Sequence, residues 1–175
     1  VLTVLDARLA ARVMIPAAVY DTTTFPNMDS RFVGWGVPII YGDFTESPTQ
    51  TVPTICIDTN VNHFELAGHT VGVIGPVYRN GVQVAHSVTQ NGPRARFTLT
   101  SYVAESDVVN ARVQGKPGLG VNMVAMTTMT HPADILYNFL TEHLAIPAAR
   151  IDTTEIVAMK EEYLPTAKAR RYLGG

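Results

Sequence analysis

A chain of 175 residues is long enough for one domain with a sizeable hydrophobic core. Only 16% of its residues are charged, against about 25% in an average soluble domain. The net charge of −2 and the lack of a basic stripe exclude sequence-independent binding to nucleic acid, and no run of about 18 apolar residues predicts a membrane span.

The scarcity of charge favours a subunit that packs into an assembly, because the cores of protein interfaces are depleted of charged side chains. The alternative is a neutral, Thr-rich β-protein that stays monomeric. Cys56 is the single cysteine, which excludes an intrachain disulfide, and the isoleucines on both sides of it indicate a buried thiol.

The first 13 residues fit two structures. Leu2, Leu5, Leu9 and Val13 recur at helical spacing and predict a short helix that ends before Pro16, although residues 1–4 would also suit a strand. Residues 20–24 have the composition of a strand, and residues 26–30 that of a loop.

The stretch 25–43 contains the single tryptophan, between two glycines. Gly34 and Gly36 let the backbone bend and let other segments approach closely. Trp35 can then act as an anchor that buries about 200 Å². A short apolar strand over 37–41 follows and is closed by Gly42, so the stretch is predicted to be a structural joint.

The middle of the chain predicts a series of short strands, over 54–58, 63–67, 71–78, 82–87, 94–99 and 108–114. Asn80-Gly81 is the preferred pair for a type I′ hairpin, because both central residues need a positive φ. Residues 94–99 alternate polar and apolar side chains, as a strand with one solvated face does. A flexible loop is expected at 115–120, and residues 121–130 are assigned to no type.

Two helices are expected after residue 130. Pro132 suits the first helical position, and Ile135, Leu136, Phe139, Leu140 and Leu144 then fall on one face. Asp152 and Glu155 have the spacing of a capping box for a second helix that ends at Pro165. A solvated basic tail is expected at Lys168, Arg170 and Arg171.

The elements together predict an α+β protein. It is mainly antiparallel β, with short strands and hairpins in a sandwich- or barrel-like arrangement, followed by two C-terminal helices. The expected division is a β-rich domain over 1–130 and a helical C-terminal segment over 131–175, which packs on it or leads to further chain.

The candidate catalytic groups do not form a convincing set. His63, His69 and Asp58 could meet across neighbouring strands, but they lack the tight spacing of a metal site. His86-Ser87 stands outside a nucleophile elbow. The paired carboxylates Glu105/Asp107 and Asp43/Glu46 lie in polar loops, and Gly115-Lys116 lacks the rest of a phosphate-binding loop. We therefore predict no catalytic residue, no cofactor and no metal.

Four pieces of the chain, in order, resemble the structural hub or tail-tip proteins of long-tailed bacteriophages. The lead-in at 20–29 is similar to that family's aromatic-Pro-x-x-Asp turn, and residues 33–43 resemble its Gly-x-x-x-Pro-x-x-Tyr-Gly strand. Residues 77–81 resemble its aromatic hairpin. Residues 113–115 followed by 131–140 resemble the passage that opens a helix. The order and approximate spacing of the pieces agree over roughly residues 20–145, which is most of the chain.

The resemblance implies a non-enzymatic structural protein of the virion, a homo-oligomer at the distal end of the phage tail. The expected arrangement is a ring, with three as the implied number of copies, between the tail tube and the distal tail, fibre or baseplate proteins. Candidate interface or joint residues are Trp35, Gly34, Gly36, Pro38, Tyr41, Gly42, Asn80, Gly81, Pro132, Ile135 and Phe139.

Two alternatives stay open. One is a tail-associated cell-wall hydrolase that uses Glu105 or Asp107. The other is a receptor- or glycan-binding module with Tyr41, Tyr78 and Tyr102 as exposed stacking platforms.

Overall fold

A computed structural model describes residues 16, 18–46, 49–101, 103–104, 106–121, 125–163 and 171–173. Two four-stranded antiparallel sheets make up most of it, in the orders β2-β9-β5-β6 and β3-β4-β8-β7. The strands are β1 (Ile39–Tyr41), β2 (Val52–Pro53), β3 (Ile55–Asp58), β4 (His63–Ala67), β5 (Val73–Arg79), β6 (Val82–Val84), β7 (His86–Asn91), β8 (Ala95–Leu99), β9 (Val109–Gln114), β10 (Gly118–Leu119), β11 (Ala125–Met126) and β12 (Arg171–Leu173).

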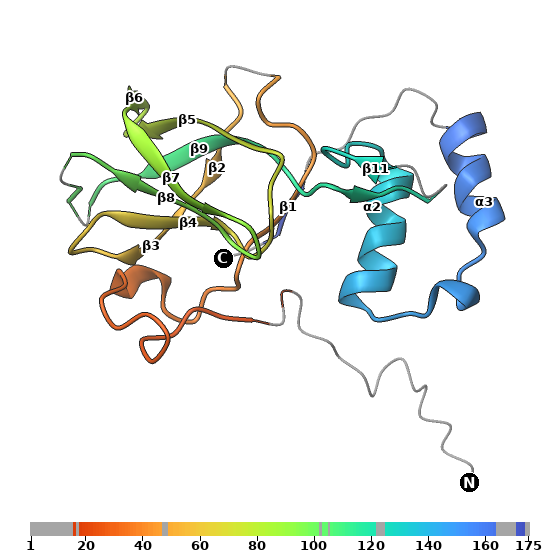
Figure 1. The fold of residues 1–175 in the computed structure, drawn as a ribbon, viewed down its shortest axis with the longest axis horizontal. Coiled ribbons are helices and arrows are strands. Elements are labelled where there is room, and N and C mark those ends of the chain that lie inside the picture. The colour runs from red at the N-terminus through yellow and green to blue at the C-terminus, as the bar shows by residue number, and fades with distance from the viewer. Residues whose placement is uncertain are drawn as a thin grey trace, which may run out of the picture.

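The two sheets are joined at two corners by single residues. Thr54 separates β2 from β3, and Ala85 separates β6 from β7, so the chain turns there from one sheet into the other. Strands that switch sheets through bends make the corners of orthogonally packed, barrel-like structures. The expectation of a mainly antiparallel α+β fold is confirmed (Figure 1).

The main core lies between the two sheets. In β8 the buried residues Ala95, Phe97 and Leu99 alternate with half-buried ones, which confirms the predicted strand with one solvated face. The ring of Phe97 stacks on that of Phe64 in β4, with the centroids 5.5 Å apart. Strand β9 alternates in the same way and supplies Val109, Ala111 and Val113 from the other sheet.

A second apolar cluster lies under residues 20–37. It contains Tyr20, Met28, Val37, Ile55 and Ile57. The two isoleucines share this face of β3, as predicted, while Cys56 between them points into the main core. Residues 22–24 form a turn and not the expected strand, because Asp21 accepts hydrogen bonds from the backbone N–H and the hydroxyl of Thr24.

The first of the two helices predicted after residue 130 begins at Pro132. Helix α2 (Pro132–Asn138) continues as a π-helical segment over Phe139–His143. The ring of His131 caps it, with Nδ1 accepting from the N–H of Ala133 at 3.1 Å. A 3₁₀ turn, Ala148–Arg150, leads to α3 (Thr153–Ala158) and a π-helical segment over Met159–Tyr163. Asp152 accepts from the N–H groups of Thr154 and Glu155, so the predicted N-cap is confirmed.

The buried face of α2 differs from the apolar stripe that the sequence predicts. Leu136 is 40% exposed, whereas Ala133, Asp134 and Asn138 are buried. The reason is that polar groups of other segments lie on the inner side of α2 and bind its polar side chains. Asp134 accepts from the N–H of Val121 at 2.9 Å.

Two further expectations need correction, and others lie outside the described residues. The loop at 115–120 contains β10, which pairs with β11. Arg171, expected in a tail, begins β12, which pairs with β1 from Ile39↔Leu173 to Tyr41↔Arg171. The helix expected over 1–13, the end at Pro165, and Lys168 and Arg170 fall on residues that the structure does not describe. Within the described residues, no helix has the length and hydropathy that a membrane crossing requires.

Candidate functional site

Backbone hydrogen bonds join the Trp35 segment to residues 18–20, and we call this pairing the clasp. The N–H of Tyr20 donates to the carbonyl of Trp35, and that of Gly34 to the carbonyl of Tyr20, both at 2.9 Å. Gly34 has a φ of +84°. A Cβ on Gly36 would lie 2.6 Å from Cγ of Pro16. The two glycines thus serve the bend and the close approach for which this residue type is suited.

Trp35 is not a buried anchor. Its indole packs edge-on against Phe32, with the ring centroids 5.2 Å apart, and 37% of the residue remains exposed. Val19 and Val33 on the same clasp are 41% and 45% exposed. We call Val19, Val33 and Trp35 the Trp35 surface. These three apolar side chains lie on two segments that are joined by backbone hydrogen bonds.

The other residues of the predicted joint are internal. Gly42 has a φ of +89°, and its N–H donates to the carbonyl of Met129 at 2.9 Å. The carbonyl of Pro38 accepts from the N–H of Gly68 at 2.9 Å. Tyr41 is wholly buried, so it is no stacking platform for a glycan, and that part of the receptor hypothesis is wrong.

The structure brings Tyr41 together with α2 and its continuation. The hydroxyl of Tyr41 donates to Oδ1 of Asn138 at 2.6 Å and lies 3.1 Å from Nε2 of His143. Ile135 packs against the cluster of Ile39, Tyr41 and Met129, and the ring of Phe139 lies 5.6 Å from that of His143. Burial, with the charge of Glu142 as the lesser cause, raises the pKa of Tyr41, so the phenol stays protonated.

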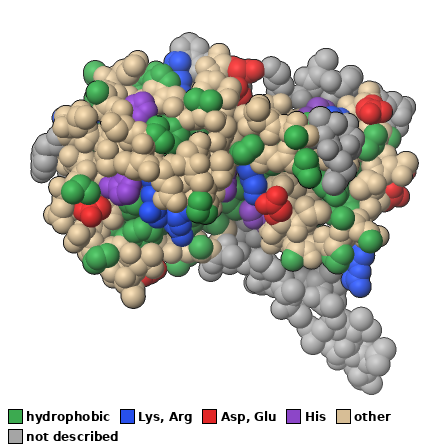
Figure 2. Space-filling view, in the orientation of Figure 1, with side chains coloured by type: hydrophobic (Ala, Val, Ile, Leu, Met, Phe, Trp, Pro, Cys, Tyr) green, Lys and Arg blue, Asp and Glu red, His purple; other side chains and the backbone are tan. Residues whose placement is uncertain are grey.

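Charged groups at this junction hold one another. Lys116 forms an ion pair with Glu142, whose other oxygen accepts from Nδ2 of Asn138 at 2.5 Å. Burial works to raise the pKa of Glu142, but Lys116 and Asn138 outweigh it and lower the pKa. Lys116 is therefore a structural cation here and not part of a phosphate-binding loop. Figure 2 shows acidic, basic and histidine side chains gathered between the two lobes on the visible face.

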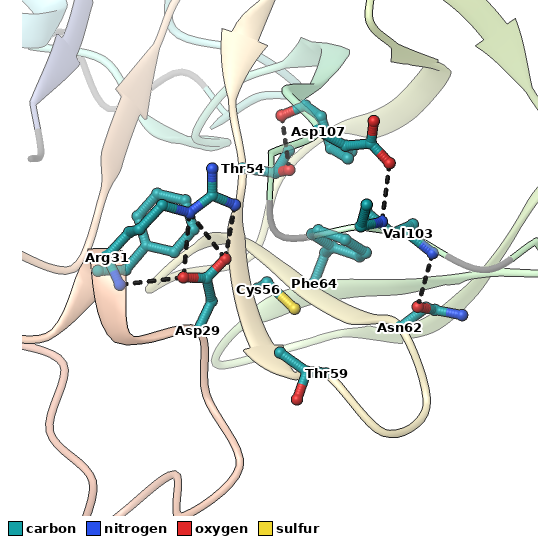
Figure 3. A pocket seen from close by; sticks show the side chains of 12 residues that line it. Asp29, Arg31, Thr54, Cys56, Thr59, Asn62, Phe64, Val103 and Asp107 are labelled. Atoms are coloured by element: carbon teal, nitrogen blue, oxygen red, sulfur yellow. Dashed lines mark hydrogen bonds and ion pairs between the residues drawn. The ribbon is translucent and has the colours of Figure 1, made fainter.

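A cavity of about 250 Å³ is lined by residues of β3, β4 and β9 and by the loops around Asp29, Asn62 and Ala104. Figure 3 shows the pair Asp29 and Arg31 on one side of it and Asp107 on the other, with Cys56 and Phe64 between. Burial raises the pKa of the Cys56 thiol to about 11, with the charge of Asp29 as a smaller cause. The thiol is thus a poor nucleophile, because the thiolate is the reactive form.

Both acids of the cavity are engaged as carboxylates. Burial works to raise the pKa of Asp29, but the hydrogen bonds and charge of Arg31 outweigh it and lower the pKa. Hydrogen bonds from Asn80 and from the N–H of Ala104 lower the pKa of Asp107. A general acid for glycoside hydrolysis needs a raised pKa, so these shifts do not favour the hydrolase hypothesis. Its other residue, Glu105, is outside the described residues.

The remaining sequence candidates have structural partners. Nε2 of His63 lies 3.0 Å from the hydroxyl of Thr89, and the ring of His86 packs edge-on against Phe97. Over the part of the chain that the structure describes, no three His, Cys, Asp or Glu side chains are grouped as metal ligands. Asp43 accepts from Nε2 of Gln114 at 3.0 Å.

Two polar groupings are missed by local sequence patterns. Asn80 and Gly81 have φ values of +50° and +81°, as the type I′ hairpin requires. The side chain of Asn80 also donates to Asp107 at 2.6 Å and accepts from the N–H of Val108 at 2.9 Å. The second grouping is an ion pair of the buried Glu65 with two arginines. The bonded residues lie 27 to 31 positions apart in the sequence, so no local periodicity predicts that they meet.

In comparisons with known proteins, no family model, no curated protein and no solved structure matches this chain.

Proposed function

We propose that this chain is a structural, non-enzymatic subunit of a bacteriophage virion, at the tail tip or baseplate hub. Copies form a ring, with three as the expected number, that caps the tail tube and connects it to fibre or baseplate proteins. The order of four sequence pieces that resemble hub proteins supports the phage assignment, and the Trp35 surface supports the assembly role.

The observation that carries the proposal is the exposure of Val19, Val33 and Trp35 along one backbone clasp. One of the resembling pieces, residues 33–43, contains two of these residues. Desolvating this surface contributes about 25 cal/mol for each Å² of apolar area removed from water. Only 16% of the residues are charged, and contact between subunits therefore desolvates few charges.

The acids near the candidate cavity support a structural role in a second way. Asp29 and Asp107 are engaged by Arg31, Asn80 and backbone N–H groups, which are contacts that fix loops. A carboxylate with filled partners is poorly placed to exchange a proton with a substrate. These contacts favour an assembly protein over the hydrolase alternative.

Electron microscopy of the purified chain tests the proposal, with Trp35→Ser as the disruptive variant. The wild type is expected to form rings with a lumen, and Trp35→Ser to shift them towards monomers. Val61→Ser is the matched control, because Val61 is 56% exposed and lies in the turn between β3 and β4.

The single tryptophan supplies an independent readout. Its fluorescence emission is expected to move to shorter wavelength as the protein concentration rises, because Trp35 leaves water on assembly. A wild type that stays monomeric up to about 1 mM, with an emission maximum that does not change, contradicts the proposal.

A further inference from the structure

Two arginines beside the buried Glu65 keep hydrogen-bond donors that the protein does not use. Glu65 is wholly buried, whereas the side chains of Arg94 and Arg96 are 31% and 20% exposed. Nη1 of Arg94 donates to Oε1 of Glu65 at 2.5 Å, and Nε of Arg96 donates to Oε2 at 2.8 Å. Within the part of the chain that the structure describes, neither guanidinium donates to any other group.

The unused donors form a complete pair on each guanidinium. In Arg94 the contact with Glu65 occupies Nη1 and leaves the edge formed by Nε and Nη2. In Arg96 the contact occupies Nε and leaves the edge formed by the two Nη atoms. An edge with two parallel N–H donors matches two oxygens of a carboxylate or phosphate group. Because both side chains bind the two oxygens of one carboxylate, they lie next to each other, within reach of one further oxyanion.

The charge of this grouping is not balanced. Two guanidinium groups share one carboxylate, and among the described acidic residues only Glu65 forms an ion pair with them. Asp58 on the neighbouring strand accepts from the N–H of Asn60 at 2.9 Å. Asp21, near Phe25 in the sequence, binds Thr24 instead. One positive charge is therefore left without a partner, which favours the binding of an anion.

The two guanidinium groups are held in place by the protein itself. Both lie over the ring of Phe25, with Cζ of Arg94 at 5.7 Å and Cζ of Arg96 at 5.5 Å from its centroid. The carboxylate of Glu65 is fixed in turn by the hydroxyl of Tyr20, at 2.8 Å. Side chains that are ordered before binding lose less conformational entropy when a ligand arrives.

We propose that Arg94 and Arg96 form a binding site for an oxyanion, of the carboxylate or phosphate class, on the outer face of the β3-β4-β8-β7 sheet. Arg96 points to that face because its neighbours in β8, Ala95 and Phe97, are buried in the core. Gln90 is the partner of Arg96 in the pairing of β7 with β8. Its amide binds no other described residue and supplies a neutral donor beside the two arginines.

NMR of the arginine Nε–H groups tests the site in the wild-type chain. Inorganic phosphate and acetate are added in separate titrations at constant ionic strength, balanced with sodium chloride. The signals of Arg94 and Arg96 are expected to shift with a dissociation constant of about 1 mM for at least one of the two ions. A response to phosphate alone assigns the site to tetrahedral oxyanions, and a response to acetate alone assigns it to carboxylates. Arg150, which is exposed in the turn before α3, is expected not to respond.

Substitutions give a second measurement. Arg94→Gln and Arg96→Gln each remove one pair of donors and are expected to raise the dissociation constant at least about tenfold. Arg150→Gln is the matched control and is expected to leave it unchanged. Thermal unfolding establishes that each variant is folded at the temperature of the titration, because Glu65 also loses a partner. Arg96→Lys keeps a cation beside Glu65 but lacks the paired donors, and is expected to weaken binding by a similar factor.

Three results would overturn the inference. They are signals of Arg94 and Arg96 that do not move with either ion, a response of Arg150 with the same concentration dependence, and unchanged binding in the folded variants. The proposed ring is tested separately, because neither arginine belongs to the Trp35 surface.

Discussion

Glu65 is a charged residue that lies wholly inside the protein. Its Oε1 accepts from the hydroxyl of Tyr20 at 2.8 Å and from Arg94 at 2.5 Å, and its Oε2 accepts from Arg96 at 2.8 Å. Both guanidinium groups also lie over the ring of Phe25. The carboxylate thereby ties β4 and β8 to the segment that carries the Trp35 surface, because Tyr20 is clasped to Trp35.

Glu65→Gln keeps the shape of the side chain and removes its charge. The free energy of unfolding is expected to fall by about 1.5–3 kcal/mol, because the amide nitrogen of Gln cannot accept from an arginine, and a hydrogen bond to a charged group contributes about that much. Glu155→Gln is the control, since that side chain is exposed in the first turn of α3, where a carboxylate contributes under about 1 kcal/mol. Equal losses in urea denaturation of the two variants would contradict this account of Glu65.

At the scale of elements, the β5–β6 hairpin depends on one backbone conformation. Gly81 has a φ of +81°, and a Cβ added there would meet no atom within 4 Å. Gly92 has equally open space but no positive φ. The two glycines differ in conformation and not in crowding, so they form a matched pair.

Gly81→Ala is expected to lower the free energy of unfolding by about 1–2 kcal/mol, the cost of a left-handed conformation for a residue with a Cβ. Gly92→Ala should change it by less than about 0.5 kcal/mol. Thermal or chemical denaturation checks both values. Equal effects would mean that the hairpin does not need its type I′ geometry.

The junction between β1 and the loop after β4 depends on a neutral histidine. Nε2 of His69 accepts from the N–H of Ile40 at 2.9 Å, and Nδ1 lies 2.7 Å from the carbonyl of Thr70, to which it donates. A protonated ring could not accept from Ile40. The pKa of His69 is lowered to about 4. Burial is the largest cause, the charges of Lys116 and His143 act in the same direction, and the Thr70 contact and Glu142 oppose them.

The folded state should therefore become less stable as the pH falls. The folded pKa of His69 lies below the ordinary 6.5, so between pH 6.5 and about 4 the unfolded chain binds a proton that the folded chain does not. Stability is lost as pH falls through this window, with a slope of at most about 1.4 kcal/mol per pH unit from this residue. Titration of the His69 ring by NMR is expected to show a midpoint near pH 4; a midpoint of 6.5 would contradict it.

At the scale of the whole molecule, local patterns predict where helices and strands form. Tertiary contacts determine which face of each element is buried. Asn80-Gly81 and Pro132 specify backbone conformations by themselves, and the hairpin and helix start are where the sequence places them. The buried face of α2 was predicted wrongly, since Asn138 meets Tyr41, which is 97 residues away. No periodicity within the helix reports such a partner.

The candidate surfaces divide in the same way. The two glycines around Trp35 indicated a joint, but the outward position of the indole depends on the clasp to Tyr20. Strand β7 is the last strand in the order β3-β4-β8-β7, and this order follows from tertiary pairing and not from a local pattern. Composition alone predicted a sparsely charged surface and not which part of it is free.

The proposed role is that of a structural subunit arranged in copies around the axis of a phage tail. Cryo-electron microscopy of virions from a phage whose genome encodes the chain is the most direct test of this proposal. Density for this fold is expected at the tail tip, in a ring of three copies around a lumen, with Trp35 in a contact between subunits. Virions that lack the chain, or that hold it as a single copy away from the tail axis, would contradict the claim.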